Sequence, residues 1–205
     1  AIHKIPNVDS YKTAPEMRSR VAYALTLPKD TLRNDTTRND TIRKDSTRKD
    51  NIRKESKEKS REVVILRDLQ TGREDTLRNV KEYIFSKHET AFAVTIQPDE
   101  KDSTDTKRVE FFDLGNHTRE TISRDPKEYK SLSFDEPGKQ LIYLATGDTS
   151  KVEQKVYDLR YYTAGADSAV VLADRDTPGL PKGWIFNEHA SPSFSKNGER
   201  VLVGA

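Results

Sequence analysis

The four histidines are the side chains in this sequence best suited to metal or acid–base chemistry, because the chain of 205 residues contains no cysteine. His3, His88, His117 and His189 are far apart, and none of their spacings resembles that of a metal-binding pair. The lack of cysteine also excludes disulfides, thiolate zinc sites and a cysteine nucleophile. We therefore expect no metal and no cofactor, and we interpret His88 and His117 as exposed loop residues.

Other residue types do not form a catalytic pattern either. An α/β-hydrolase nucleophile needs a Gly-x-Ser-x-Gly turn, and the sequence has no Gly-x-Ser triplet. Asp135, Glu136 and Asp167 are carboxylates close to aromatic residues, but nothing marks them as an acid–base pair, and a turn explains Asp135. The nine glycines are dispersed, which excludes a phosphate-binding loop. Trp184 is expected to pack in a strand, with ligand stacking as the alternative. We expect no catalytic residues in this chain.

The conspicuous repeat is a five-residue unit that runs from Asp30 to Lys54 and places an arginine in every unit. None of the regular structures with this period buries enough apolar surface to fold alone, so we interpret residues 30–61 as a solvated, charged insertion. The alternative is a polyanion-binding strip. Each arginine follows an aspartate by three positions, and no aromatic residue interleaves for base stacking, so we expect no nucleic-acid partner. The arginines are Arg33, Arg38, Arg43, Arg48 and Arg53.

A second, longer repeat sets the fold. Three segments begin with Phe and a Ser or Asp, continue through a polar turn and enter an alternating apolar run; they span 85–94, 134–143 and 194–203. Between them lie apolar strands with an Asp-Leu pair, at Asp68-Leu69, Asp113-Leu114 and Asp158-Leu159, each 45 residues after the last. Two short elements that alternate with such a period are typical of four-stranded propeller blades.

These repeats predict an all-β chain that forms a partial β-propeller of about three and a half four-stranded blades with a long charged hairpin insertion. Residues 22–27 match residues 91–96, so the insertion is expected between the second and third strands of blade one, where a long loop costs little closure entropy. We expect an N-terminal segment over 1–18, in which the first strand of blade one is sought at 11–18, and the propeller over 19–205. The blades are predicted at 19–80, 81–126, 127–187 and from near Ala190. The alternative is a set of β-meanders that form a sandwich.

The Phe-Ser-x-x-Gly turn at Phe194 to Gly198, and the Asp-Leu strand followed by Thr71-Gly72, resemble the propeller of the prolyl oligopeptidase family, and in particular of dipeptidyl-peptidase-like bacterial members. The resemblance covers about residues 19 to 205. His88 and Glu89 depart from the usual Asp-Gly turn. The resemblance implies an α/β-hydrolase domain on the same parent chain, which the propeller would gate and scaffold, and peptide substrates. The adjacent glutamate pair with which some members bind a substrate amino terminus does not occur here.

Three functions therefore remain open: the propeller of an exported serine peptidase, a non-enzymatic protein-binding platform, and a polyanion-binding protein. We expect the chain to be part of a longer protein that is periplasmic or extracellular, although no signal peptide pattern begins at Ala1. No apolar run approaches the roughly 18 residues that span a bilayer, so no membrane span is expected.

Overall fold

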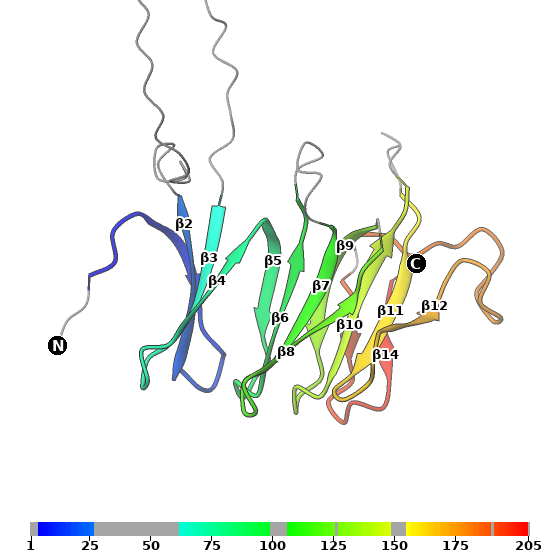
Figure 1. Cartoon of the computed structure of the whole chain (residues 1–205). Coiled ribbons are helices and arrows are strands. Elements are labelled where there is room, and N and C mark those ends of the chain that lie inside the picture. Colours follow the sequence, from blue (N-terminus) through cyan, green and yellow to red (C-terminus); the bar gives the residue numbers. More distant parts are fainter. Residues whose placement is uncertain are drawn as a thin grey trace, which may run out of the picture.

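The computed structural model describes residues 4–26, 62–98, 106–125, 127–148, 155–189 and 191–204. In these ranges all regular structure is β-strand, and the sheets stand side by side in chain order from blue to red (Figure 1). Three sheets have four antiparallel strands and the last has two. The prediction of an all-β partial propeller is therefore confirmed. None of the described residues forms a helix long and apolar enough to cross a membrane.

Blade one comprises β1 (Val8–Lys12), β2 (Arg20–Thr26), β3 (Glu62–Asp68) and β4 (Glu74–Arg78), in that spatial order. Its first strand begins three residues upstream of the predicted range 11–18 and overlaps that range at Tyr11 and Lys12, inside the segment 1–18. β2 pairs with β3 from Arg20↔Asp68 to Thr26↔Glu62, so the intervening segment connects two adjacent antiparallel strands. The predicted insertion at 30–61 lies outside the described residues.

Blade two comprises β5 (Val80–Phe85), β6 (Ala91–Ile96), β7 (Arg108–Asp113) and β8 (Thr118–Ser123). Blade three comprises β9 (Glu128–Phe134), β10 (Gln140–Thr146), β11 (Asp158–Thr163) and β12 (Val170–Ala173). A hairpin of β13 (Ser193–Phe194) and β14 (Val201–Leu202) follows. β5 contacts β9, and β9 contacts β13, so the first strands of blades two, three and four are neighbours. This is the inner-to-outer strand order of a propeller blade.

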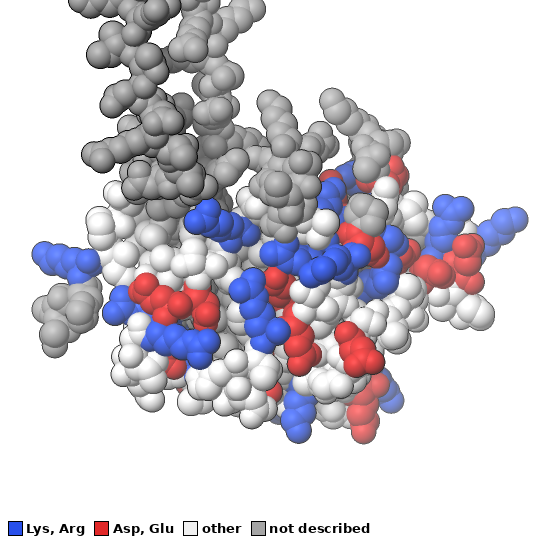
Figure 2. Space-filling view, viewed as in Figure 1, with Lys and Arg blue, Asp and Glu red and all other residues white. Residues whose placement is uncertain are grey.

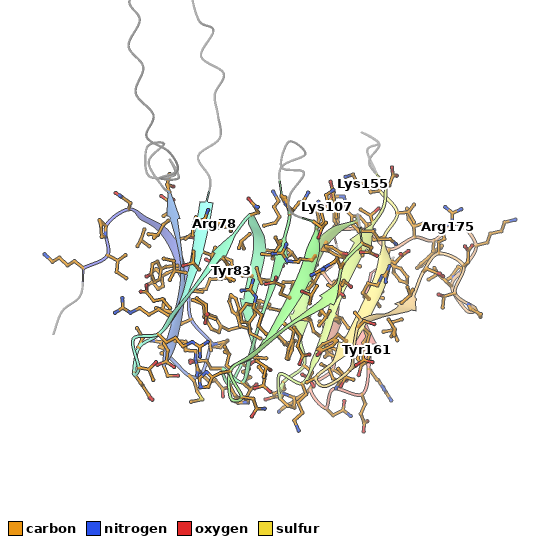
Figure 3. All side chains as sticks on the ribbon, in the orientation of Figure 1. Arg78, Tyr83, Lys107, Lys155, Tyr161 and Arg175 are labelled. Carbon is orange, nitrogen blue, oxygen red and sulfur yellow. The ribbon has the colours of Figure 1, made fainter. Side chains whose placement is uncertain are left out.

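The core is divided among the interfaces between successive blades. Because both faces of a middle strand meet another blade, every residue of β6 is buried, and its alternate side chains enter different interfaces. Phe92, Val94 and Ile96 pack towards blade one, whereas Ala91 and Ala93 pack towards blade three. Figure 3 labels Tyr83, a residue of β5 that packs in the first of these interfaces. The third interface packs β10 and β11 against the last hairpin through Ile142, Leu144, Tyr157, Leu159, Phe194 and Val201.

The register corrects two details of the predicted repeat. The backbone N–H groups of Leu69, Leu114 and Ala164 each donate to the residue that precedes the second strand of their blade, which makes these three positions equivalent. Asp158-Leu159 is therefore not the third member of the Asp-Leu series. It begins β11, five residues before the equivalent position, and Asp158 pairs there with Lys127.

The second detail is the alignment of residues 22–27 with 91–96, which is wrong by two residues. Arg20 pairs with Asp68 in blade one, as Ala91 pairs with Asp113 in blade two. A shift of two residues keeps each side chain on the same face of a strand, so the apolar pattern by itself does not distinguish the two alignments.

Candidate functional site

The turns that join the first and second strands of blades two, three and four share one backbone design. Ser86, Asp135 and Ser195 occupy the first position of these turns, and their side-chain oxygens accept backbone N–H bonds at the start of the following strand. Asp135 accepts from Lys139 at 2.8 Å and from Gln140 at 2.9 Å. Asp135 is thus a turn-forming carboxylate, in agreement with its sequence interpretation.

Three residues later each turn has a residue of positive φ, and this residue contacts the preceding blade. In blades three and four it is glycine, Gly138 with φ 74° and Gly198 with φ 72°. A Cβ atom on Gly138 would lie 2.6 Å from Ser86 Cβ and 2.4 Å from Thr90 Oγ1, so the turns of blades two and three touch directly. Glycine is required here both for its backbone conformation and for this close approach.

Blade two has Glu89 at this position, with φ 56°. Its side chain is 1% exposed and reaches blade one, where its carboxylate accepts the backbone N–H of Ser19 at 3.0 Å and the Ser19 hydroxyl. Arg20 Nη1 lies 3.2 Å from Glu89 Oε1, and Arg20 Nη2 lies 3.3 Å from Asp68 Oδ2 and donates to the Leu114 carbonyl at 3.0 Å. We call Ser19, Arg20, Asp68 and Glu89 the inter-blade clasp. It keeps a non-glycine residue in a conformation that costs of order 1–3 kcal/mol.

Beside the clasp, the turns enclose a basin with a volume of about 670 Å³. Its floor and walls come from the turns of blades one, two and three at the end of the sheets opposite the β2–β3 connection. Met17, Leu114, Pro137 and Ala164 supply apolar surface. A smaller cleft of about 150 Å³ lies between the β3–β4 and β7–β8 turns, and Arg20 lines both. The two spaces are therefore neighbours, and they also share Asp113, Leu114 and His117 in their linings.

Two aspartates at this end of the molecule are held ionised by turn hydrogen bonds. Backbone N–H donation from Thr71 lowers the pKa of Asp68, and backbone donation from Asn116 lowers the pKa of Asp113. Both carboxylates are occupied by turn backbone, and Asp68 also pairs with Arg20. They contribute fixed negative charge near the clasp and are poor candidates for proton transfer.

A second, half-buried carboxylate joins blades two and three on their inner strands. Glu82 accepts the backbone N–H groups of Ser131 at 2.8 Å and Leu132 at 3.1 Å, where Ser131 has φ 58° at an irregularity of β9. Burial raises the pKa of Glu82 despite these two hydrogen bonds. Glutamates therefore bridge both interfaces around blade two.

The predicted surface histidines lie where the sequence placed them. His88 Nδ1 lies 3.1 Å from Glu16 Oε2, and His117 and His189 are exposed in loops; His3 lies outside the described residues. Glu136 pairs with Lys87 at 2.6 Å, and Asp167 is exposed. No group of three or more potential metal ligands gathers among the described residues. The structure brings none of these residues together as a nucleophile, base and acid.

The expectation that Trp184 packs in a strand is wrong. Its side chain is 52% exposed, and its backbone N–H donates to the Pro181 carbonyl in a turn next to Gly183, which has φ 88°. The apolar residues around Trp184 resembled a strand, but Pro181 and Gly183 favour a turn. Over the viewed face, Lys and Arg are interspersed with Asp and Glu, so this face has no field of a single sign (Figure 2).

Solved structures share this arrangement of sheets. Acylaminoacyl peptidase from Pyrococcus horikoshii superposes with a TM-score of 0.52 over 97% of this chain and 28% of its own length, at 11% sequence identity. This chain has the fold of a partial β-propeller. No family model matches its sequence, and no curated protein sequence does.

Two further structures are more distant. The β-propeller domain of the Trilobed protease from Pyrococcus furiosus has a TM-score of 0.49 and 13% identity over 80% of this chain and 40% of its own. TolB from Acinetobacter baumannii has a TM-score of 0.44 and 14% identity over 95% of this chain and 37% of its own. The propeller chain spans less than half the length of each of these three structures.

Sequence reasoning noted Glu89 only as a departure from the usual turn, and it missed Arg20 and Ser19. The available signal was a glutamate at the turn position where the two equivalent turns have glycine. Residues other than glycine are uncommon at positive φ, so a glutamate there points to a specific role for its side chain. Its partners are some 70 residues away in the sequence and could not be identified without the pairing of the blades.

Proposed function

We propose that this chain is the propeller of an exported serine peptidase, in which it gates and scaffolds an α/β-hydrolase domain carried by the same parent polypeptide. The observation that carries the proposal is the superposition on acylaminoacyl peptidase, which covers 97% of this chain but 28% of that protein. A peptidase of that size has room for a separate catalytic domain. The sequence of this chain has no nucleophile turn, which is consistent with catalysis by another domain.

The architecture suits a gate. Successive blades pack through apolar interfaces, and the first strands of blades two, three and four are neighbours, so the sheets form one continuous packed wall. The carboxylates of half-buried Glu82 and buried Glu89 bridge the two interfaces of blade two. A rigid wall admits substrates by size, and it would exclude folded proteins while it passes short peptides.

The test uses the parent polypeptide. We expect it to contain a downstream Gly-x-Ser-x-Gly motif and to react with a fluorophosphonate that labels active serines. Deletion of the propeller should raise hydrolysis of a folded protein relative to hydrolysis of a tripeptide amide. A parent without a labelled serine contradicts the proposal, and so does an unchanged ratio of the two hydrolysis rates. Export is tested separately, by fractionation of cells that produce the parent.

A second candidate is a non-enzymatic protein-binding platform, and the outer strand of blade three favours it. The outer strands β4 and β8 are largely charged and polar and bury Leu77 and Ile122. β12 instead exposes Val170, Val171 and Leu172 to 56%, 46% and 45%. An apolar edge strand is a surface for pairing with another chain. In this function the parent carries no active serine and binds a protein partner through β12, which Val171→Lys should weaken.

A further inference from the structure

We propose that the basin beside the inter-blade clasp binds the carboxyl end of a peptide with an apolar terminal side chain. The basin's volume of about 670 Å³ lies within the range of about 300–1,000 Å³ that is usual for small-ligand sites. Such sites combine apolar walls with a few polar groups that orient the ligand.

The apolar component comes from four residues on four different turns or connections. Met17 precedes β2, Leu114 begins the β7–β8 turn, Pro137 lies in the β9–β10 turn, and Ala164 begins the β11–β12 turn. Met17 is 49% exposed although it lines a concave surface, so a ligand there would remove its side chain from water. Burial of this apolar side chain would favour binding in proportion to the apolar surface area removed from water.

The charge of the basin selects an anion, because most of its ionised groups are already paired. Arg20 and Glu89 bind each other, His88 pairs with Glu16, and Asp113 accepts hydrogen bonds from the backbone and side chain of its own turn. His117 and Lys139 are different. Among the described residues the Lys139 side chain has no hydrogen-bond or ion-pair partner, and the His117 side chain makes no hydrogen bond and has only the electrostatic attraction of Asp113, whose pKa it helps to lower; both side chains are exposed on the lining of the basin.

An ammonium group and an imidazole beside an apolar hollow complement a carboxylate attached to an apolar group. The carboxyl terminus of a peptide has this chemistry. A peptidase binds such termini in its substrates and releases them in its products. The choice of a peptide over another carboxylate therefore rests on the proposed function. Binding at the basin itself requires no catalytic domain.

The experiment titrates the chain with acetyl-Ala-Leu-Phe that has a free carboxylate, and in parallel with its carboxamide and with octanoate, followed by calorimetry. We expect the carboxamide to bind about tenfold more weakly than the free acid, because it loses the charged contacts with both Lys139 and His117, each worth up to about 1 kcal/mol. Lys139→Met, which keeps the apolar stem, and His117→Asn, which suits positive φ, should each weaken the acid about fivefold. Lys182→Met is the matched control at an exposed lysine outside the basin, and it should change nothing.

The apolar component is tested by Met17→Asp, which should abolish measurable binding of the acid. Equal affinity for acid and carboxamide overturns the proposal, and so does unchanged binding by Lys139→Met and His117→Asn. Octanoate that binds as tightly as the peptide overturns the assignment to a peptide. These results do not depend on serine labelling of the parent, so failure of the basin and failure of the proposed peptidase are distinguishable.

Discussion

Replacement of Glu89 by glycine tests the inter-blade clasp, because the change removes a buried carboxylate and relieves backbone strain at the same time. Relief of φ 56° on a non-glycine residue is worth about 1 kcal/mol. Loss of one partner from a buried ion pair costs about 3–5 kcal/mol. Arg20 retains Asp68 and the Leu114 carbonyl, so the lower end of that range applies. We therefore expect Glu89→Gly to lower the free energy of unfolding by about 2 kcal/mol.

The assay is urea and thermal unfolding of the chain followed by circular dichroism. For a chain of this size, 2 kcal/mol corresponds to a fall in Tm of roughly 4–8 °C. His117→Gly is the matched control, because His117 has the same φ of 56° but its exposed side chain makes no hydrogen bond or salt bridge among the described residues. It reports the relief of strain alone, and the control protein should be unchanged or more stable by up to about 1 kcal/mol.

Glu89→Gln keeps an oxygen acceptor for Ser19 but loses the charge that faces Arg20, so its stability should lie between those of wild type and Glu89→Gly. If Glu89→Gly is as stable as wild type or more stable, the carboxylate does not hold blades one and two together. The positive φ would then be a cost without compensation, and the reasoning from burial and pairing would be refuted.

Three further outcomes test other parts of the fold. Gly138→Ala should lower the free energy of unfolding by about 2–5 kcal/mol, because the new Cβ would collide with Thr90 and Ser86. Gly72 has the same φ of 74° but open space around it, so Gly72→Ala should cost only about 1–2 kcal/mol. Urea unfolding measures both. Burial raises the pKa of Glu82, so the folded chain keeps the Glu82 carboxyl protonated to higher pH than the unfolded chain does. As the pH rises above 4.5, the ordinary pKa of a glutamate, the wild type should therefore lose stability relative to Glu82→Gln. Unfolding at a series of pH values measures this difference. A linker of about six residues in place of the 35 between β2 and β3 should stabilise the chain by about 1–2 kcal/mol through loop closure, and a loss of stability would show that the natural segment contributes contacts.

The sequence was sufficient to predict the turns, because the interactions that form a turn are made between neighbouring residues. Pro137-Gly138 and Asn197-Gly198 supply the backbone conformations of two equivalent turns, and the apolar runs that follow them form the strands β10 and β14. Blade two was predicted at 81–126, and its strands span 80–123. Where a turn residue and an alternating pattern occur together, neighbouring residues decide the structure.

The site could not be predicted in the same way, because its residues meet across blades. Glu89 reaches Ser19 only after two complete sheets have formed and packed, and no local pattern encodes a distance of that kind. At the third Asp-Leu pair a local pattern was present, but it led to a wrong prediction. Asp158-Leu159 kept the spacing of 45 residues by coincidence, whereas the hydrogen-bonded register places its equivalent at Thr163-Ala164. A short motif is too common in a strand-rich chain to fix a register by itself.

Each complete blade is made of four strands that are consecutive in the sequence, which has a consequence for folding during synthesis. A blade can pair all its strands as soon as its own last strand has left the ribosome, without any later part of the chain. Blade one is the exception in timing, because 35 residues separate β2 from β3. At ordinary rates of translation β2 would wait about 2–7 s for its partner. During this interval the β1–β2 hairpin is a nascent edge, and the charged composition of the segment then being synthesised disfavours aggregation of the emerging chain until β3 arrives.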